Sequence, residues 1–136
     1  MKYDIYVFEE KKTASFLKKA MAEYEKRLSR YCKITCRFIR KQNEWEKILK
    51  NNPDSIAILP GKDSVSSEMF SEQINCWETG GMGKRVFLVP PEGEKGMRQN
   101  VFPLSDFTME NGLTALILLE QIYRGYRILH NHPYHK

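Results

Sequence analysis

Two short runs of apolar residues constrain the fold of this chain more than any other feature. Residues 55–59 read SIAIL and residues 85–89 read RVFLV, so consecutive positions in each run are apolar. A strand with apolar side chains on both faces must be covered on both faces, as the inner strands of parallel sheets are. Parallel neighbours also need long crossover connections, which are usually helices. The two runs therefore predict an α/β fold with a mostly parallel sheet and helices on both faces.

Three other segments have the pattern of strands. Residues 2–8, KYDIYVF, alternate polar and apolar side chains, which is typical of a half-buried strand. Residues 33–40 are expected to form a second strand, and residues 100–104 a last short extended segment. Strands then alternate with helices along the whole chain, which is the order of an α/β domain.

Helical patterns lie between these strands. Apolar residues recur at three- and four-residue steps after Thr13 and after Ser64, and both residues can cap a helix. Asn43 is the third candidate cap, for a short helix that contains Trp45. The inner sides of the first and third helices are expected to carry Phe16, Leu17, Ala20, Met21, Tyr24, Leu28 and Tyr31, and Val65, Met69, Phe70, Ile74 and Trp77. The last helix is expected over about residues 111–130.

We expect one domain, residues 1–136, because a chain of this length can bury a core without disulfides or metals. No run approaches the roughly 18 to 20 apolar residues that span a bilayer. The segment MKYDIYVFEEKK carries charges where a signal peptide needs an apolar core. We therefore expect a cytoplasmic protein with no membrane partner. The formal net charge of +5 favours a polyanionic partner without establishing one.

Two patterns are weak evidence for chemistry. Cys32, Cys36 and Cys76 match no zinc spacing and are expected to be plain buried or half-buried thiols. Residues 80–84, GGMGK, resemble part of a phosphate loop. Arg85 follows where that loop requires serine or threonine, and the expected order is helix then strand. A connecting turn is therefore the favoured interpretation.

The C-terminal segment is rich in histidine. His130, His132 and His135 lie within six residues, which raises the question of a metal site. Pro133 prevents them from sharing one face of a regular element, so a single functional histidine is favoured over a metal site.

The last helix is unusually apolar. Residues 113–119 are apolar apart from Thr114, so this helix is expected in the core or at a subunit interface. A polar stripe nevertheless falls within about 60° of the helix surface. It is formed by Glu120, Arg124, Arg127 and Asn131. A glutamate–arginine pair on a solvated face would explain this stripe as well as a functional surface would.

One family has the same combination of motifs. LLEQIYRGYRI followed by a terminal PYHK resembles the ending of the ribosomal RNA large subunit methyltransferase H family of SPOUT-class methyltransferases, of which this chain would be a divergent member. Residues 21–34, residues 59–74 with LPGKDSVSSEMFSEQI, and LSDFT at residues 104–108 are similar to other segments of that family. The resemblance covers the whole chain.

The resemblance implies a SPOUT (alpha/beta knot) fold with a C-terminal trefoil knot, and a homodimer that binds S-adenosylmethionine. The implied reaction is methylation of N3 of a pseudouridine in large-subunit (23S) ribosomal RNA, on the assembled ribosome. The alternative is a catalytically impaired paralogue that acts as an RNA- or ribosome-binding dimer. A role without nucleic acid is the third possibility. No metal is implied.

The same resemblance implies the site residues. The catalytic set would be Glu120, Arg124, Tyr134 and His135, with Tyr134 and His135 reaching the cofactor pocket of the partner subunit. The cofactor would contact three loops that follow strands. They contain Leu59, Pro60 and Gly61; Leu88, Val89, Pro90 and Gly93; and Leu104, Ser105, Phe107 and Thr108.

The sequence also departs from the family pattern. Pro90 and Pro91 stand where the family has glycines, and the segment from there to Leu104 is shorter. Glu110 and Asn111 replace a proline–histidine pair, and Ala115 replaces an arginine. Proline has no N–H and a fixed φ, so we predict that this loop binds S-adenosylmethionine more weakly than a glycine-rich loop does.

Overall fold

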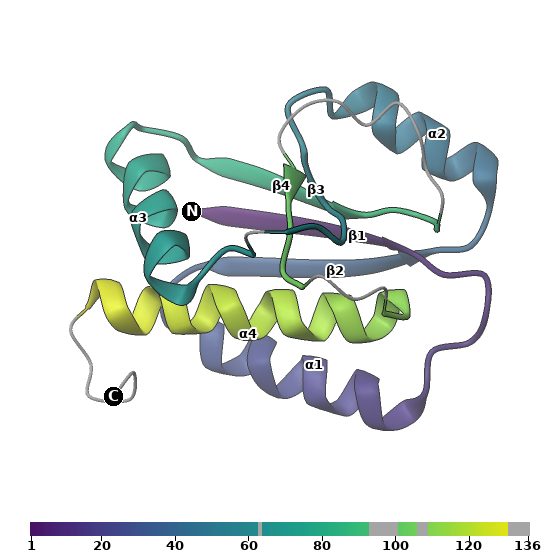
Figure 1. Ribbon diagram of the computed structural model, residues 1–136, viewed down its shortest axis with the longest axis horizontal. Helices are drawn as coiled ribbons and strands as arrows, with labels where there is room; N and C mark the ends of the chain where they lie inside the picture. Colours follow the sequence, from purple (N-terminus) through teal and green to yellow (C-terminus); the bar gives the residue numbers. More distant parts are fainter. Residues whose placement is uncertain (63, 93–100, 106–108, 131–136) are drawn as a thin grey trace.

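The computed structural model describes residues 1–62, 64–92, 101–105 and 109–130. Its centre is one five-stranded sheet in the order β2-β1-β4-β3-β5 (Figure 1). All the paired strands run parallel, which confirms the predicted parallel sheet. The strands are β1 (Lys2–Phe8), β2 (Lys33–Ile39), β3 (Ile56–Ile58), β4 (Lys84–Val89) and β5 (Val101–Phe102).

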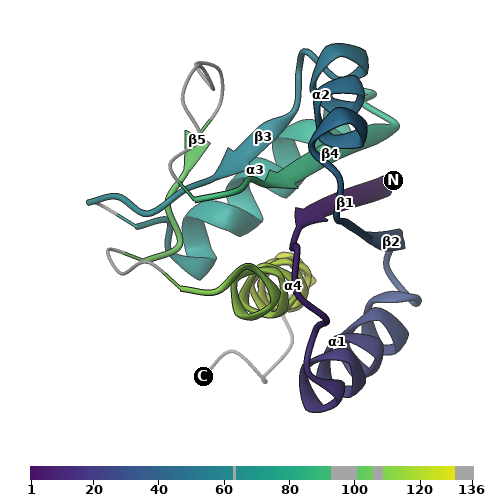
Figure 2. The same ribbon diagram turned by 90° about the vertical axis from the view of Figure 1, so that its right-hand side faces the viewer.

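Helices cover both faces of this sheet, as predicted. On one face lie α1 (Ser15–Leu28), α3 (Ser67–Thr79) and α4 (Asn111–Leu129), and on the other lies α2 (Gln42–Asn51) (Figure 2). Side chains on the two faces of β1 show why both layers are needed. Tyr3 packs into the core below α4, whereas Phe8 packs against Trp45 of α2, with ring centroids 5.8 Å apart.

Aromatic side chains fill the core between the sheet and α4. Tyr3 stacks on Phe87 of β4, and Tyr126 of α4 meets Tyr3 edge-on. The Tyr126 hydroxyl lies 3.1 Å from the Tyr3 hydroxyl and donates a short hydrogen bond to Glu78 at the end of α3. Tyr3, Tyr126 and Glu78 thereby attach the last turns of α4 to the amino end of the sheet.

The predicted caps were wrong for all three helices. Ala14, not Thr13, is the N-cap of α1, and Lys41, not Asn43, is the N-cap of α2. At α3 the cap is Ser66, whose hydroxyl accepts from the Met69 N–H at 3.1 Å, and Ser64 lies two residues earlier. Several residues near each helix start are compatible with a cap, so the path of the incoming chain decides which one is used.

Two residues expected on inner helix faces are exposed. Phe16 is 70% exposed and Met69 is 51% exposed. Each precedes a buried residue, Leu17 and Phe70, and successive helix positions differ by about 100° in direction. Once the neighbour faces the core, the preceding side chain must point sideways into solvent.

The connection between α3 and β4 is a turn, as predicted. It contains Gly81 at φ 79°, a conformation that favours glycine, and β4 begins at Lys84. Cys32 and Cys36 are half-buried free thiols, as predicted, whereas Cys76 is free but exposed, so its predicted burial was wrong. Within the described part of the chain, no helix has the length and apolar content to cross a membrane.

Candidate cofactor pocket and catalytic helix

A pocket of about 710 Å³ lies at the carboxyl ends of β1, β3 and β4, beside the first turn of α4. Open parallel sheets bind ligands at this edge. All three loops predicted to hold cofactor contribute to its wall. The contributing residues are Leu59 and Pro60, Val89 and Pro90, and Leu104 and Ser105. The structure therefore brings together segments that are far apart in the sequence.

Other predicted cofactor residues are placed differently. Leu88 is fully buried and packs on the α2 face of the sheet, and it is not among the described residues that line the pocket. Its alternation with Val89 explains the difference, because successive strand residues point to opposite faces. Gly93, Phe107 and Thr108 lie outside the described residues.

Gly61 joins the first and third loops. Its N–H donates to the Ser105 carbonyl oxygen at 3.1 Å, and Val65 N–H donates to the Pro103 carbonyl oxygen at 2.8 Å. A Cβ atom at Gly61 would lie 3.2 Å from the Pro103 Cβ, which is closer than most side chains tolerate. The glycine thus permits a close backbone approach between the two loops.

Asn111 is a site residue that the sequence reasoning missed. It begins α4, and its side-chain amide donates to the Phe8 carbonyl oxygen at 2.5 Å and to the Pro90 carbonyl oxygen at 2.9 Å. A single side chain therefore holds the ends of β1 and β4 against the helix. The sequence showed only that Asn111 departs from the family pattern.

The segment after β1 also lines the pocket without having been predicted. It contributes Glu9, Glu10, Lys11, Lys12, Thr13 and Ala14, next to Phe8 at the end of β1. The topology could have indicated this segment, because every inner strand of a parallel sheet brings its carboxyl end to the same edge, where ligands bind. Nothing in residues 9–14 alone marks them as a binding loop.

The pocket fits S-adenosylmethionine in size and in chemistry. Its volume lies within the roughly 300 to 1,000 Å³ of typical small-molecule sites. Leu17, Ile58 and Val89 supply an apolar wall suited to a base, and the backbone of three loops is at hand for polar groups. The carboxylates of Glu9, Glu10, Glu92 and Glu110 outnumber the ammonium groups of Lys11 and Lys12 on the described lining, which favours a cationic sulfonium.

The predicted catalytic pair lies elsewhere on α4. Glu120 Oε1 is 3.0 Å from Arg124 Nε, and the two side chains are 32% and 42% exposed. The contact is an ion pair without the N–H alignment of a hydrogen bond. Glu120 is nine residues beyond Asn111, or about 13 Å along the helix. Neither Glu120 nor Arg124 is among the described residues lining the pocket, and Tyr134 and His135 lie outside the described residues.

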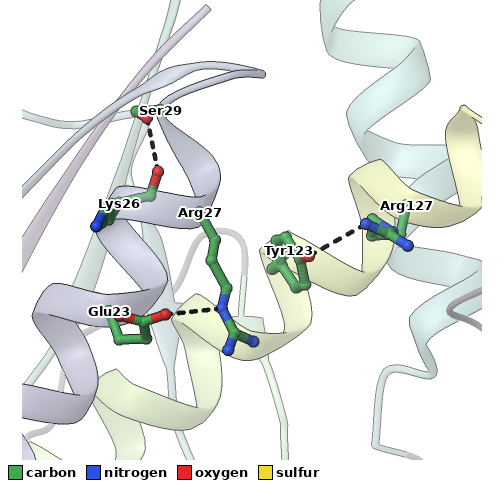
Figure 3. A network of polar contacts seen from close by, with 6 residues as sticks. All are labelled: Glu23, Lys26, Arg27, Ser29, Tyr123 and Arg127. Carbon is green, nitrogen blue, oxygen red and sulfur yellow. Dashed lines mark hydrogen bonds and ion pairs between the residues drawn. The ribbon is translucent and has the colours of Figure 1, made fainter.

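Arg127, the next arginine of the predicted stripe, interacts with an aromatic neighbour. Its Nη1 donates to the Tyr123 hydroxyl at 3.3 Å, and Arg27 of α1 lies over the same ring, 5.9 Å from its centroid (Figure 3). Arg27 in turn pairs with Glu23 at 3.2 Å. The predicted stripe therefore divides into the Glu120–Arg124 pair and an Arg127 whose guanidinium contacts Tyr123 of the same helix. Asn131 lies outside the described residues.

The Glu120–Arg124 pair lies among apolar side chains on α4. Leu113, Ile117 and Ile128 fall on the same side of the helix as the pair, within an arc of about 80°. All three are partly buried. A face that mixes half-buried apolar side chains with an ion pair is typical of the surface where two proteins meet.

Comparison with known proteins agrees with this geometry. The family model described as "Predicted SPOUT methyltransferase" matches residues 1–135. "Ribosomal RNA large subunit methyltransferase H 1" of Thermoanaerobacter sp. (strain X514) is 35% identical over 136 residues, which is 100% of both chains.

Two further relatives have the same description. A "Ribosomal RNA large subunit methyltransferase H" of Thermotoga sp. (strain RQ2) is 31% identical, covering 91% of this chain and 93% of its own. One of Clostridium perfringens (strain 13 / Type A) is 34% identical, covering 89% and 91%. Because the similarity is full-length and includes the pocket loops and α4, this chain belongs to the ribosomal RNA large subunit methyltransferase H family of SPOUT methyltransferases.

Proposed function

We propose that this protein transfers a methyl group from S-adenosylmethionine to N3 of a pseudouridine in large-subunit ribosomal RNA, on the assembled ribosome in the cytoplasm. The observation that carries the proposal is the convergence of three loops, all C-terminal to strands, on one pocket large enough for the cofactor. The names of the full-length relatives supply the substrate class.

The protein's own residues would position the reactants and manage one proton. Residues of the three loops and Asn111 would hold S-adenosylmethionine, which supplies an activated methyl group. N3 of the target base must lose its proton before its electron pair can form the new bond to carbon. Glu120 or His135 would accept that proton, and the Arg124 guanidinium would stabilise the negative charge that develops on the base.

We also propose that each active site is shared between two copies of the chain. Within one chain, the Glu120–Arg124 pair is remote from the pocket, whereas the apolar residues beside it suit an interface. In a symmetric dimer, α4 of one protomer would bring its pair, together with Tyr134 and His135, to the pocket of its partner. The C-terminal segment would then be part of the site.

We also propose that the chain forms the trefoil knot of the fold family. The path of the chain after β4 supports this proposal. The chain returns to pair β5 beside β3, and residues 103 and 105 then accept hydrogen bonds from Val65 and Gly61 before α4 begins. The segment after β3 and the segment before α4 are thus in direct contact.

The alternative is a catalytically impaired paralogue that binds ribosomes as a dimer. One observation favours it: Pro90 and Pro91 both line the pocket, and neither has an N–H to offer a ligand. Calorimetric titration with S-adenosylmethionine separates the two functions, because only the enzyme needs the cofactor. Undetectable cofactor binding at millimolar concentration, with ribosome binding retained, would favour the paralogue.

A complementation experiment tests the shared site directly. Asn111→Ala damages the cofactor pocket. Arg124→Ala leaves the pocket unchanged and removes the guanidinium that is proposed to stabilise the negative charge on the target base. The two variants are assayed at a cofactor concentration at which neither transfers methyl groups alone. If the sites are shared, an equal mixture of the two should then recover roughly a quarter of the wild-type methyl transfer, because half the dimers are mixed and each has one intact site. A mixture as inactive as its components would contradict the shared site.

A further inference from the structure

The amino-terminal half of one sheet face carries a row of basic side chains. Register places Lys2 of β1 beside Lys33 of β2 and beside Lys84 of β4. Partners in register on adjacent parallel strands point to the same face, and neighbouring strands lie about 4.8 Å apart. Three lysines therefore project side by side from three consecutive strands.

A fourth cation lies on the same face. Arg37 is four residues beyond Lys33 on β2, so it points in the same direction, and its register partner is Tyr6. The guanidinium carbon lies 6.0 Å from the centroid of the Tyr6 ring. We refer to Lys2, Lys33, Arg37 and Lys84 as the basic sheet face. All four side chains are exposed.

The helix on this side of the sheet covers only the other half. α2 packs through Trp45 on the carboxyl-terminal part of the strands, where the buried residues are Phe8, Ile39, Val86 and Leu88. In Figure 2, α2 lies above the sheet on this side, while α1, α3 and α4 lie on the opposite side. Among the described residues, no helix covers the basic sheet face.

The charges on this face are poorly compensated. Asp4 is its one described carboxylate, and it lies 3.1 Å from Lys84 Nζ and 3.9 Å from Lys2 Nζ. Asp4 is 7% exposed, so it acts as a fixed support beneath the two lysines. Four cations against one carboxylate leave a local excess of positive charge, and like charges on facing strand positions destabilise a sheet.

From this arrangement we propose that the basic sheet face binds the phosphate backbone of the ribosomal RNA. The three lysines start from strands about 4.8 Å apart, and Arg37 lies about 13 Å farther along β2, so the four cations can meet more than one phosphate of a nucleic-acid backbone. The Tyr6 ring with Arg37 over it offers a surface on which an unpaired base can stack. A second copy of this chain is a poor partner for this face, because two basic sheet faces would repel each other.

The position of this face suits the proposed reaction, on which the inference rests. The end of α4 lies at the same edge of the sheet, where Tyr126 contacts Tyr3 and His130 stacks on Tyr31, two residues before β2 begins. RNA bound to the basic sheet face would therefore lie near the end of the helix that carries the proposed catalytic pair. The cofactor pocket is at the opposite ends of the strands, so changes to this face leave the pocket intact.

The test compares two double variants with the same change in charge. Lys33→Gln with Arg37→Gln neutralises the two cations of the basic sheet face that do not pair with Asp4. Lys18→Gln with Lys19→Gln, two exposed positions on α1 at the opposite face, is the matched control. Each protein is titrated against purified ribosomes at several salt concentrations, and its S-adenosylmethionine affinity is measured by calorimetry.

We expect the sheet-face variant to lose roughly eightfold in ribosome affinity per phosphate contact at 0.1 M salt, with a salt slope lower by about 0.9 per contact. The control should bind like the wild type, and cofactor affinity should be unchanged in both. Lys33→Arg with Arg37→Lys should restore binding. Lys33→Gln alone keeps the Arg37–Tyr6 contact and should show about half of the change in slope.

Equal ribosome affinity in the sheet-face variant and the control would overturn the inference while leaving the proposed function intact. Failure of the proposed function has a different signature, in which the wild-type protein transfers no methyl group to ribosomes or binds no cofactor. Loss of cofactor affinity in the sheet-face variant would also overturn the inference, because the effect would then act through the pocket.

Discussion

Asn111 donates a hydrogen bond to the carbonyl oxygen of Pro90 and so connects the first turn of α4 to the loop that departs most from the family pattern. The same amide also reaches the Phe8 carbonyl oxygen. Three walls of the pocket therefore depend on one side chain.

Asn111→Ala should weaken both stability and cofactor binding. It leaves two carbonyl oxygens without their donor, which costs about 1 to 3 kcal/mol in the free energy of unfolding. Urea unfolding and calorimetric titration with S-adenosylmethionine measure the two effects. Asn43→Ala removes an exposed amide of α2 and is the control, with an expected change within about 0.5 kcal/mol. Equal stability of the two variants would show that the Asn111 bonds contribute little.

Replacing Pro90 and Pro91 with glycine should tighten cofactor binding. Each replacement restores a backbone N–H at the pocket wall, and one or two new hydrogen bonds are worth about 1 to 3 kcal/mol, or roughly ten- to a hundredfold in affinity. Calorimetry on the wild type and the double variant measures the difference. Tight binding by the wild type and no change in the variant would mean that the prolines do not limit the cofactor.

Deleting residues 134–136 should abolish methyl transfer while leaving the fold, the dimer and cofactor binding intact. The prediction follows from the proposed role of Tyr134 and His135 in the partner's site and from their position after the last buried turn of α4. The measurement is transfer of a labelled methyl group to ribosomes, beside calorimetry with the cofactor. Full activity of the truncated protein would remove these residues from the site.

Ile117→Asp should convert the proposed dimer to a monomer. Ile117 lies on the α4 face that also carries Glu120 and Arg124, and a carboxylate there would have to be buried without a partner when two copies associate. Sedimentation at micromolar concentration measures the change in mass. Met69→Asp, at an exposed position of α3, is the control and should leave the mass unchanged. A monomeric wild type would contradict the shared site itself.

Stability should fall at alkaline pH. Burial raises the pKa of Tyr3 and of Tyr126 above the ordinary 10.0, and it raises the pKa of Cys32 from 9.0 to about 12. Between the ordinary and the raised pKa, the unfolded chain binds fewer protons than the folded one. The free energy of unfolding therefore falls as pH rises above about 9, by up to about 1.4 kcal/mol per pH unit for each group.

Urea unfolding at pH 7, 9, 10 and 11 measures this decline. Burial also raises the pKa of Cys36 above the ordinary 9.0, so both thiols contribute between about pH 9 and 10. Cys32→Ala removes one of the two and should make the decline in this range shallower, by about half. A free energy of unfolding that is constant to pH 11 would contradict the burial of these groups.

Much of the fold could be predicted from the sequence because strand and helix periodicity act locally. The residues 2–8 pattern gave β1 at its observed bounds, and the buried runs became β3 and β4 at the centre of the parallel sheet. The caps Thr13, Asn43 and Ser64 failed because capping depends on backbone dihedral angles, which the type of residue does not determine.

The sequence predicted those residues of the candidate site that belong to a family motif. It did not predict the residues whose role depends on packing in the folded chain. Leu59, Pro60 and Ser105 were placed in the pocket by resemblance, and the structure brings them together. Asn111 and the segment after β1 were missed, because their role depends on which carbonyl groups lie within reach of one amide after folding. The basic sheet face could not be seen either, since strand register decides that Lys2, Lys33 and Lys84 are neighbours.

The bond between Gly61 and Ser105 has a consequence for how this family can diverge. Because β5 pairs with β3 and Gly61 N–H donates to the Ser105 carbonyl oxygen, the first and third loops are joined by bonds that lie outside the interval between Glu92 and Val101. Insertions, deletions and substitutions in that interval can therefore accumulate over evolution while two sides of the pocket keep their shape. Members of the family can thus change their affinity for the methyl donor through substitutions in one segment, while the protein keeps the ability to fold.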